Sequence, residues 1–179
     1  MTDPLAETTL GSETVYEGRI VDVRIDDVAA PGGRRFRREV VVHPGAVAAV
    51  PLTTEGEVVM VRQWRQPAGK VLLEIPAGKL EPGEEPEECL RRELAEEIGL
   101  APGHIEKLFG LYLAPGYSSE LIHIYLATEL TPAAGEQDAD ECVEAQRLPL
   151  VEAARMCVRG EIEDAKTVAG ILAAAARRL

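Results

Sequence analysis

The feature that constrains this chain most is a glutamate-bearing helix that is bounded by glycines. Residues 76–78, Pro-Ala-Gly, break a strand-like pattern, and a helix is predicted over residues 86–98. Pro86 suits the first helical turn and Gly99 suits the helix end. The buried stripe of this helix recurs every four residues, at Leu90, Leu94 and Ile98. Residues 76–99 are therefore expected to form a loop, a helix and a second turn.

Strand-like segments lie on both sides of the predicted helix. Residues 13–29 alternate β-branched and polar side chains, which suits a hairpin or two short strands. Further strands are predicted over residues 36–43, 46–52, 57–64, 71–75, 105–113, 120–128 and 142–148, and further helices over 150–158 and 164–178. This order predicts an α/β or α+β fold, a mixed sheet with helices on its faces. We expect a small N-terminal antiparallel β unit over residues 1–45 and a main domain over residues 46–179.

The composition is that of a folded protein and excludes some partners. Hydrophobic residues make up 46% of the chain and charged residues 28%. The formal net charge of −12 argues against a nucleic-acid-binding surface, which needs a basic patch. The sequence has no signal-peptide pattern and no apolar run of roughly 18 residues that would span a membrane. Three cysteines without CxxC spacing indicate reduced thiols, so a cytoplasmic location is expected.

Three glutamates of the predicted helix point to a metal site. Positions three and four apart share one helix face, so Glu93, Glu96 and Glu97 project together. Carboxylates this close repel one another unless a cation neutralises them. Oxygen ligands favour hard ions, namely Mg²⁺, Mn²⁺ or Ca²⁺. Taken alone, three such glutamates are also compatible with an ordinary solvated helix face.

The spacing around these glutamates resembles the Nudix box. Gly78, five residues, Glu84, seven residues and then the run from Arg92 to Leu100 match all nine specified positions of the box. The resemblance implies the Nudix α/β/α sandwich. It also implies a hydrolase that cuts the pyrophosphate of a nucleoside diphosphate compound by attack of water on phosphorus.

The same resemblance implies a set of metal ligands. Two or three Mg²⁺ or Mn²⁺ ions are expected to screen the diphosphate charge, polarise the P–O bond and lower the pKa of the attacking water. The implied ligands are the Ala77 carbonyl and the carboxylates of Glu93, Glu96 and Glu97. Arg92 is expected to orient these glutamates through ion pairs, and Glu84 to anchor the loop.

A general base must take the remaining proton of the attacking water. Glu141 stands where related enzymes have a catalytic glutamate, and it is the preferred candidate in an acidic loop. Asp138, Asp140 and Glu144 remain alternatives, because Ala139 interrupts the acidic pattern that is commoner in the family. The implied catalytic residues are thus Glu141, Glu97 and Arg92.

The substrate must be inferred from residues outside the box. Pro115 lies 15 residues beyond Leu100, and this resembles the marker of the bacterial ADP-ribose pyrophosphatase subfamily. The segments RQWRQP, LEIPAGKLEPGE, SSELIHIYLATEL and DADECVEAQRLPLVEA resemble their counterparts there. The resemblance implies hydrolysis of ADP-ribose to AMP and ribose 5-phosphate. The alternatives are another substrate, such as a GDP- or UDP-hexose, or a non-catalytic nucleotide-sensing Nudix module.

The subfamily resemblance also implies substrate contacts and a homodimer. Arg65 would contact the pyrophosphate, since a guanidinium pairs bidentately with phosphate. Arg37 and Glu39 would hold the adenine side, across a dimer interface formed by the N-terminal strands. Glu120 is a candidate for contacts to metal or to the terminal ribose. The substrate-binding set is completed by the turn residues Pro115 and Gly116.

Overall fold

The computed structural model describes residues 3–135 and 142–177 and divides into two compact units. The first unit comprises Met1–Gly45 with Tyr112–Leu121, and the second comprises Ala46–Leu111 with Ile122–Leu179. The sequence prediction had placed residues 112–121 in the main domain.

This segment joins the first unit through backbone hydrogen bonds to Val41. The Val41 amide donates to the Tyr117 carbonyl at 2.7 Å, and the Ser119 amide donates to the Val41 carbonyl at 3.0 Å. These bonds join positions far apart in the chain, which local sequence patterns do not report.

The first unit is a three-stranded antiparallel sheet of β1 (Thr8–Glu17), β2 (Asp22–Ala29) and β3 (Arg35–Val42). The hairpin expected over residues 13–29 is present, with a longer first strand than predicted. Every residue of β1 is exposed, including the apolar Leu10, Val15 and Tyr16. The outer edge of this sheet therefore offers unpaired backbone groups and apolar side chains to another chain.

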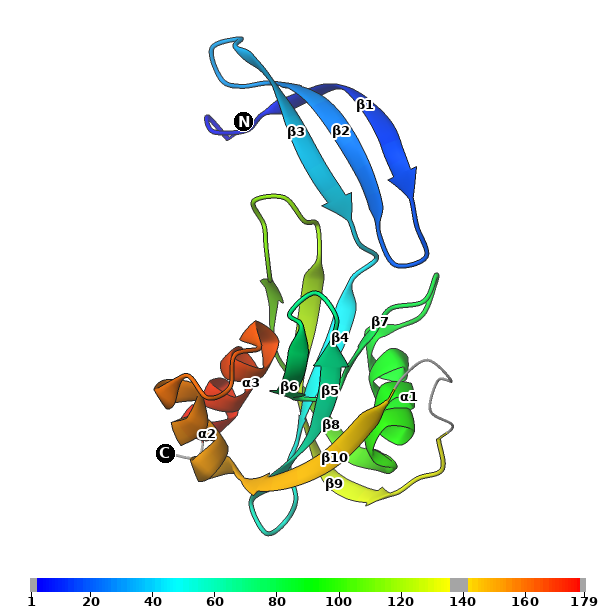
Figure 1. Ribbon diagram of the computed structural model, residues 1–179, viewed down its shortest axis with the longest axis vertical. Coiled ribbons are helices and arrows are strands. Elements are labelled where there is room, and N and C mark those ends of the chain that lie inside the picture. The colour runs from blue at the N-terminus through cyan, green and yellow to red at the C-terminus, as the bar shows by residue number, and fades with distance from the viewer. Residues whose placement is uncertain (1–2, 136–141, 178–179) are drawn as a thin grey trace. The chain divides into compact units, whose positions relative to one another are not determined.

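The second unit places strands between helices, as predicted. One sheet has the strand order β10 (Val143–Pro149), β5 (Glu57–Arg65) and β6 (Lys70–Glu74). The other has the order β7 (Ala77–Lys79), β4 (Ala46–Pro51), β9 (Leu121–Pro132) and β8 (Leu100–Tyr112). β4 pairs in parallel with β9 and antiparallel with β7. Figure 1 shows α1 (Pro86–Ile98) on one side of these strands, and α2 (Leu150–Arg159) and α3 (Ala165–Ala176) on the other.

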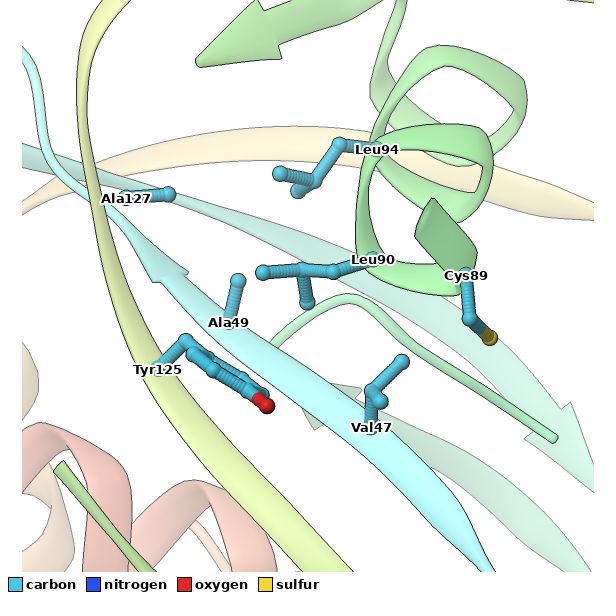
Figure 2. Close-up of a cluster of buried hydrophobic side chains, with 7 residues drawn as sticks. All are labelled: Val47, Ala49, Cys89, Leu90, Leu94, Tyr125 and Ala127. Carbon is cyan, nitrogen blue, oxygen red and sulfur yellow. The ribbon is translucent and has the colours of Figure 1, made fainter. Parts of the chain in front are cut away.

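The core beneath α1 holds the functional helix in place. Figure 2 shows Leu90 and Leu94 of α1 directed toward β4 and β9. The cluster consists of Val47, Ala49, Cys89, Leu90, Leu94, Tyr125 and Ala127. Burial raises the pKa of the Cys89 thiol to about 12, so it packs as a neutral group. The periodic stripe found in the sequence is thus the face that fixes α1 on the sheet.

The opposite face of β4 is covered by α3. A Cβ added at Gly170 would lie only 3.1–3.3 Å from Val50, Ile75 and Ile124, so the glycine lets helix and sheet approach closely. Because both faces of β4 are covered, all six of its residues are buried. Asp164 caps α3 by accepting a hydrogen bond from the Thr167 amide at 3.0 Å.

Two strand boundaries differ from the sequence prediction. Residues 77–79 were expected to be loop, yet they form β7 by pairing Ala48 with Ala77 and Ala46 with Lys79. β8 begins at Leu100 rather than near residue 105, although it contains Pro102. A proline is tolerated there because β8 lies at the edge of its sheet. Both differences arise from pairing with strands distant in sequence.

Among the helices formed by residues 3–135 and 142–177, none is both long enough and apolar enough to cross a membrane.

Leu94 provides a test of how strongly this core anchors α1. The side chain is fully buried, so Leu94→Ala should lower the free energy of unfolding by about 2–5 kcal/mol. Glu88→Gln, on the exposed side of the same helix, should change it by less than about 0.5 kcal/mol. Urea denaturation of both variants measures the difference, and equal effects would contradict the assigned packing.

Candidate active site

Arg92 is the centre of an ion-pair network on α1. Its Nε and Nη2 donate to the two carboxylate oxygens of Glu84, at 3.0 and 3.2 Å. Its Nη1 donates to Glu93 at 2.7 Å and to Glu96 at 3.1 Å. Glu84 and Glu93 raise the pKa of Arg92, and the hydrogen bonds that Arg92 donates to Glu84 are the largest cause. Arg92 thus orients two of the expected metal ligands and does so from a fixed position.

Glu84 joins this network to the loop before α1. Its carboxylate accepts a hydrogen bond from the Glu81 amide at 3.0 Å as well as those from Arg92. The bonds from Arg92 are the largest cause of a lowered pKa for Glu84. The loop is therefore tied to the helix by a carboxylate that is charged at neutral pH.

The carboxylates of Glu93 and Glu97 are buried against β7, the short strand that precedes the loop. These residues are only 8% and 5% exposed. A Cβ at Gly78 would overlap the carboxylate of Glu93, so only glycine permits this approach. The Ala77 amide donates to Glu97 at 3.0 Å. Two anions are thus brought to one short stretch of backbone, which is costly unless cations accompany them.

A hollow of about 550 Å³ adjoins Glu97 and the end of α1. It is lined by the last turn of α1 (residues 95–99), by residues 133–135, and by Val143 and Ala145 of β10. Glu96 and Glu97 contribute carboxylates to its wall. An acidic wall of this kind attracts cations, and it would repel a diphosphate that arrived without them.

The predicted metal ligands suit a hard divalent cation, since all are carboxylate or backbone oxygens. Over residues 3–135 and 142–177, no three His, Cys, Asp or Glu side chains are grouped so as to hold a metal ion. Arg92 engages the carboxylates of Glu93 and Glu96 instead. The burial of Glu93 and Glu97 beside Gly78 is the observation that fits a cation here, and the ligand set stays a prediction.

Arg65 lies at the end of β5 and is held from within the protein. Its Nε and Nη2 donate to the two oxygens of Glu74, both at 2.8 Å. Glu74 is the main cause of a raised pKa for Arg65, and the charges of Asp164 and Glu97 act in the same direction. Arg65 therefore lies within electrostatic range of a predicted metal ligand, as expected for a group that contacts the same diphosphate.

Three predicted substrate residues come together in the first unit. Arg37, Glu39 and Gly116 line one hollow of about 310 Å³, together with Ile25, Arg38 and Tyr117. Arg37 pairs with Asp27 at 3.5 Å, and both side chains are about two-thirds exposed, at 64% and 65%. Such an exposed pair is weak, so the Arg37 guanidinium can exchange it for a ligand at little cost.

The neighbouring loop is a turn, in agreement with its Pro-Gly sequence. The amides of Tyr117 and Ser118 donate to the Ala114 carbonyl at 3.1 and 2.9 Å around Pro115. Glu120 is partly exposed at the end of this loop. The structure thus assigns Pro115 a conformational role, and contacts of Pro115 or Glu120 with substrate stay predictions.

The candidates for the general base are only partly covered by the described residues. Asp138, Asp140 and Glu141 lie outside them. Glu144 lies on β10, where it is 72% exposed and pairs with Arg62 at 2.7 Å. Such an exposed pair is weak, so Glu144 stays an alternative, as it was from the sequence.

Sequence analysis missed a buried group behind Arg65. Glu74 is 1% exposed and Lys166 is 6% exposed, and their side chains form an ion pair. Glu74 stands as a lone charge in an apolar run, LLEIP, whereas Lys166 follows Asp164 by two positions. A charged residue in such a run was the available signal, because buried charges normally need partners.

Comparison with known families identifies the family of the chain. The family described as the NUDIX domain matches residues 42–171. The chain belongs to the Nudix family. A second family, the nucleoside diphosphate sugar hydrolase N-terminal domain, matches residues 7–41 of this Nudix protein.

Individual relatives extend along nearly the whole Nudix chain. It is 41% identical over 169 residues to the ADP-ribose pyrophosphatase of Bacillus subtilis (strain 168), covering 93% of this chain and 91% of the relative. It is 43% identical over 168 residues to the methanol dehydrogenase activator of Bacillus methanolicus, covering 92% and 90%. A crystal structure of an ADP compounds hydrolase superposes with a TM-score of 0.86 at 26% identity, covering 99% of this chain and 96% of the other. The predicted mixed α/β Nudix fold is thus confirmed.

The pH dependence of stability tests the link between Glu84 and Arg92. The pKa of Glu84 is lowered in the folded state, so its contribution to stability is present above the unfolded pKa of about 4.3 and is lost as pH falls through the folded value. Glu84→Gln should therefore lower the free energy of unfolding at pH 7 by about 1–2 kcal/mol.

The difference between wild type and this variant should shrink as the pH falls below 4. Denaturant titrations at several pH values measure it, with the exposed Glu88→Gln as the control for loss of one negative charge on the same segment. A difference that persists unchanged in acid would contradict the assigned ion pair.

Proposed function

We propose that this protein hydrolyses ADP-ribose to AMP and ribose 5-phosphate with the help of Mg²⁺ or Mn²⁺. The observation that carries the proposal is the burial of Glu93 and Glu97 beside Gly78, with Arg92 orienting the box. The 41% identity to an ADP-ribose pyrophosphatase over 93% of the chain supports this choice of substrate. The three free thiols support the proposed cytoplasmic location.

The metal would be held by the carboxylates of α1 and the backbone before it. Glu93 and Glu97 are the principal proposed ligands, with Glu96 and the Ala77 carbonyl as further ligands for two or three ions. When bound, the ions supply charge neutralisation, polarisation of the P–O bond and a lower pKa of the attacking water. Arg92 would act through the glutamates that it holds and would not touch the substrate.

The protein's own residues would bind the substrate at two places. Arg65, fixed by Glu74, would donate to an oxygen of the diphosphate. Arg37 and Glu39 would hold the adenine side, and Pro115 and Gly116 would shape the adjoining turn. Glu120 is proposed to contact the metal or the terminal ribose.

We propose a homodimer formed through the N-terminal strands, because the exposed apolar residues of β1 are then covered. The proposed assembly would also bring Arg37 and Glu39 to the adenine across the subunit interface.

The proposed general base is Glu141, on the strength of the family resemblance. It would accept a proton from the water as the water attacks phosphorus, and the departing phosphate would leave as AMP or as ribose 5-phosphate. Glu144 remains an alternative, since its ion pair with Arg62 is exposed and weak.

Two other functions are compatible with a Nudix fold. A GDP- or UDP-hexose hydrolase would use the same metal site, and the nucleoside diphosphate sugar match over residues 7–41 is compatible with it. A non-catalytic nucleotide sensor would normally lose box carboxylates, whereas Glu84, Glu93, Glu96 and Glu97 are all present. One relative is named a methanol dehydrogenase activator, so activation of another enzyme is a specific form of the non-catalytic alternative.

Metal-dependent turnover is the direct test. Purified protein with Mg²⁺ should release phosphatase-sensitive products from ADP-ribose faster than from GDP-mannose or UDP-glucose. Glu97→Gln should lower kcat by about a hundredfold or more while the fold remains, because it removes a ligand charge but keeps an acceptor for the Ala77 amide.

The matched control is Glu88→Gln, an exposed glutamate on the same helix. A preference for another nucleotide sugar would exclude the ADP-ribose assignment. Full turnover by Glu97→Gln would exclude the proposed metal site.

The first unit can be tested separately through Arg37. Arg37→Ala should raise KM for ADP-ribose by about tenfold with little change in kcat, because Arg37 is proposed to bind the adenine side far from the reacting phosphorus. Arg35→Ala, a change of the same type on the same strand but outside the hollow, should leave KM unchanged. Equal effects of both variants on KM would contradict the proposed role of Arg37 in binding adenine.

Sedimentation of the wild-type protein would test the proposed dimer.

A further inference from the structure

A chain of charged side chains runs from Arg65 into the interior of the second unit. Glu74 binds Arg65 through both of its oxygens, and its Oε2 also accepts a hydrogen bond from the Lys166 ammonium. Lys166 in turn pairs with Asp164 at 3.0 Å. The side chains of Glu74 and Lys166 are 2% and 8% exposed, whereas that of Arg65 is 39% exposed. Arg65 is therefore the most exposed member of this chain, followed by Asp164 at 16%.

The geometry of the Arg65–Glu74 pair fixes the guanidinium plane. Both bonds are 2.8 Å long and use Nε and Nη2, so they hold one edge of the group in a two-point contact. A guanidinium has five N–H donors, and this contact uses two of them. The other edge can donate to an external oxygen without breaking the contact with Glu74.

Lys166 keeps the net charge of the cluster around Arg65 from becoming negative. Glu74 by itself would cancel the positive charge of Arg65, and Asp164 adds a second negative charge nearby. With Lys166 the four charges balance, and without it the cluster would carry one net negative charge. A net negative cluster near Glu97 would repel a diphosphate, so Lys166 preserves the attraction of Arg65 for phosphate.

The first turn of α3 also supports the strand that leads to the metal loop. The Thr167 hydroxyl oxygen accepts a hydrogen bond from the Ile75 amide at 2.8 Å, next in sequence to Glu74. Two residues further on, the Ala77 amide donates to Glu97. The start of α3 therefore holds both the carboxylate that fixes Arg65 and the backbone that enters the site.

We propose that Glu74 and Lys166 are positioning residues for phosphate recognition, which hold the Arg65 guanidinium and keep its charge available to the diphosphate beside Glu97. The inference rests on the proposed function for the identity of the ligand. Neither residue touches the substrate. Their effect is transmitted through Arg65.

A double-mutant cycle tests the proposal on the full-length protein. Lys166→Met removes the charge but keeps the length and apolar stem of the side chain, and Glu74→Gln keeps the shape of the carboxylate. Each should lower kcat/KM for ADP-ribose by about ten- to a hundredfold, because a misplaced or neutralised Arg65 loses its phosphate contact. In an Arg65→Ala background, either change should add less than about twofold, since the residue through which they act is already gone.

The matched control is Lys70→Met, which removes a lysine from an exposed ion pair with Glu163. It should leave kcat/KM unchanged. A purely structural role of the buried pair predicts a different pattern, in which the losses follow the free energy of unfolding and are equally large with and without Arg65. That pattern would overturn the proposal.

A binding measurement separates this inference from the proposed reaction. The affinity for α,β-methylene ADP-ribose, whose diphosphate cannot be hydrolysed, is measured by calorimetry with Mg²⁺ for the same variants. A drop of about tenfold for Lys166→Met and none for Lys70→Met supports the positioning role even if ADP-ribose is not turned over. Unchanged affinity for Lys166→Met and Glu74→Gln, or absence of binding by wild type, overturns it.

Discussion

The burial of two carboxylates against the short strand β7 is the constraint on which the site depends. Glu93 and Glu97 are almost fully enclosed, and they meet the chain where Gly78 has no side chain to exclude them. Anions in such a place need compensating charge and hydrogen bonds. Arg92 supplies a cation, and the Ala77 amide supplies a donor. The remaining negative charge is what suits the site to divalent metal ions.

The rest of the second unit holds α1 and β7 in fixed positions relative to each other. Leu90 and Leu94 fasten α1 to β4 and β9, so the helix face that carries the glutamates cannot rotate away from the loop. The short strand β7 fastens the other side of the site by pairing with β4. The same strand β4 is thus in contact with both the helix and the loop, and it aligns the two. Rigid support of this kind is what a catalytic constellation requires.

The proposed phosphate contact draws on distant parts of the chain. Arg65 comes from β5, and the residues that hold it come from β6 and from the start of α3. A diphosphate ligand would need such an arrangement, because the chain carries a net charge of −12. Local cations with buried partners can reverse that field over a few ångströms. The arginines of β3 are a second group of cations, in the first unit, and their carboxylate partners are not buried.

The sequence alone determined the box, the helix that carries it and the class of fold. Those features depend on interactions between residues close in the chain: the four-residue stripe of α1, the proline and glycine at its ends, and glutamates three and four apart. The helix was predicted with the bounds that the structure has, residues 86–98. Strand interiors were also recovered from alternation and apolar runs.

The pairing of strands and of buried charged side chains depends on the tertiary structure. β7, the early start of β8 and the joining of residues 112–121 to the first unit all result from backbone bonds between distant segments. The same holds for the pairing of Glu74 with Lys166, which lie 92 positions apart. A lone charge in an apolar run shows that a partner must exist, but the identity of that partner depends on which segments the fold brings together.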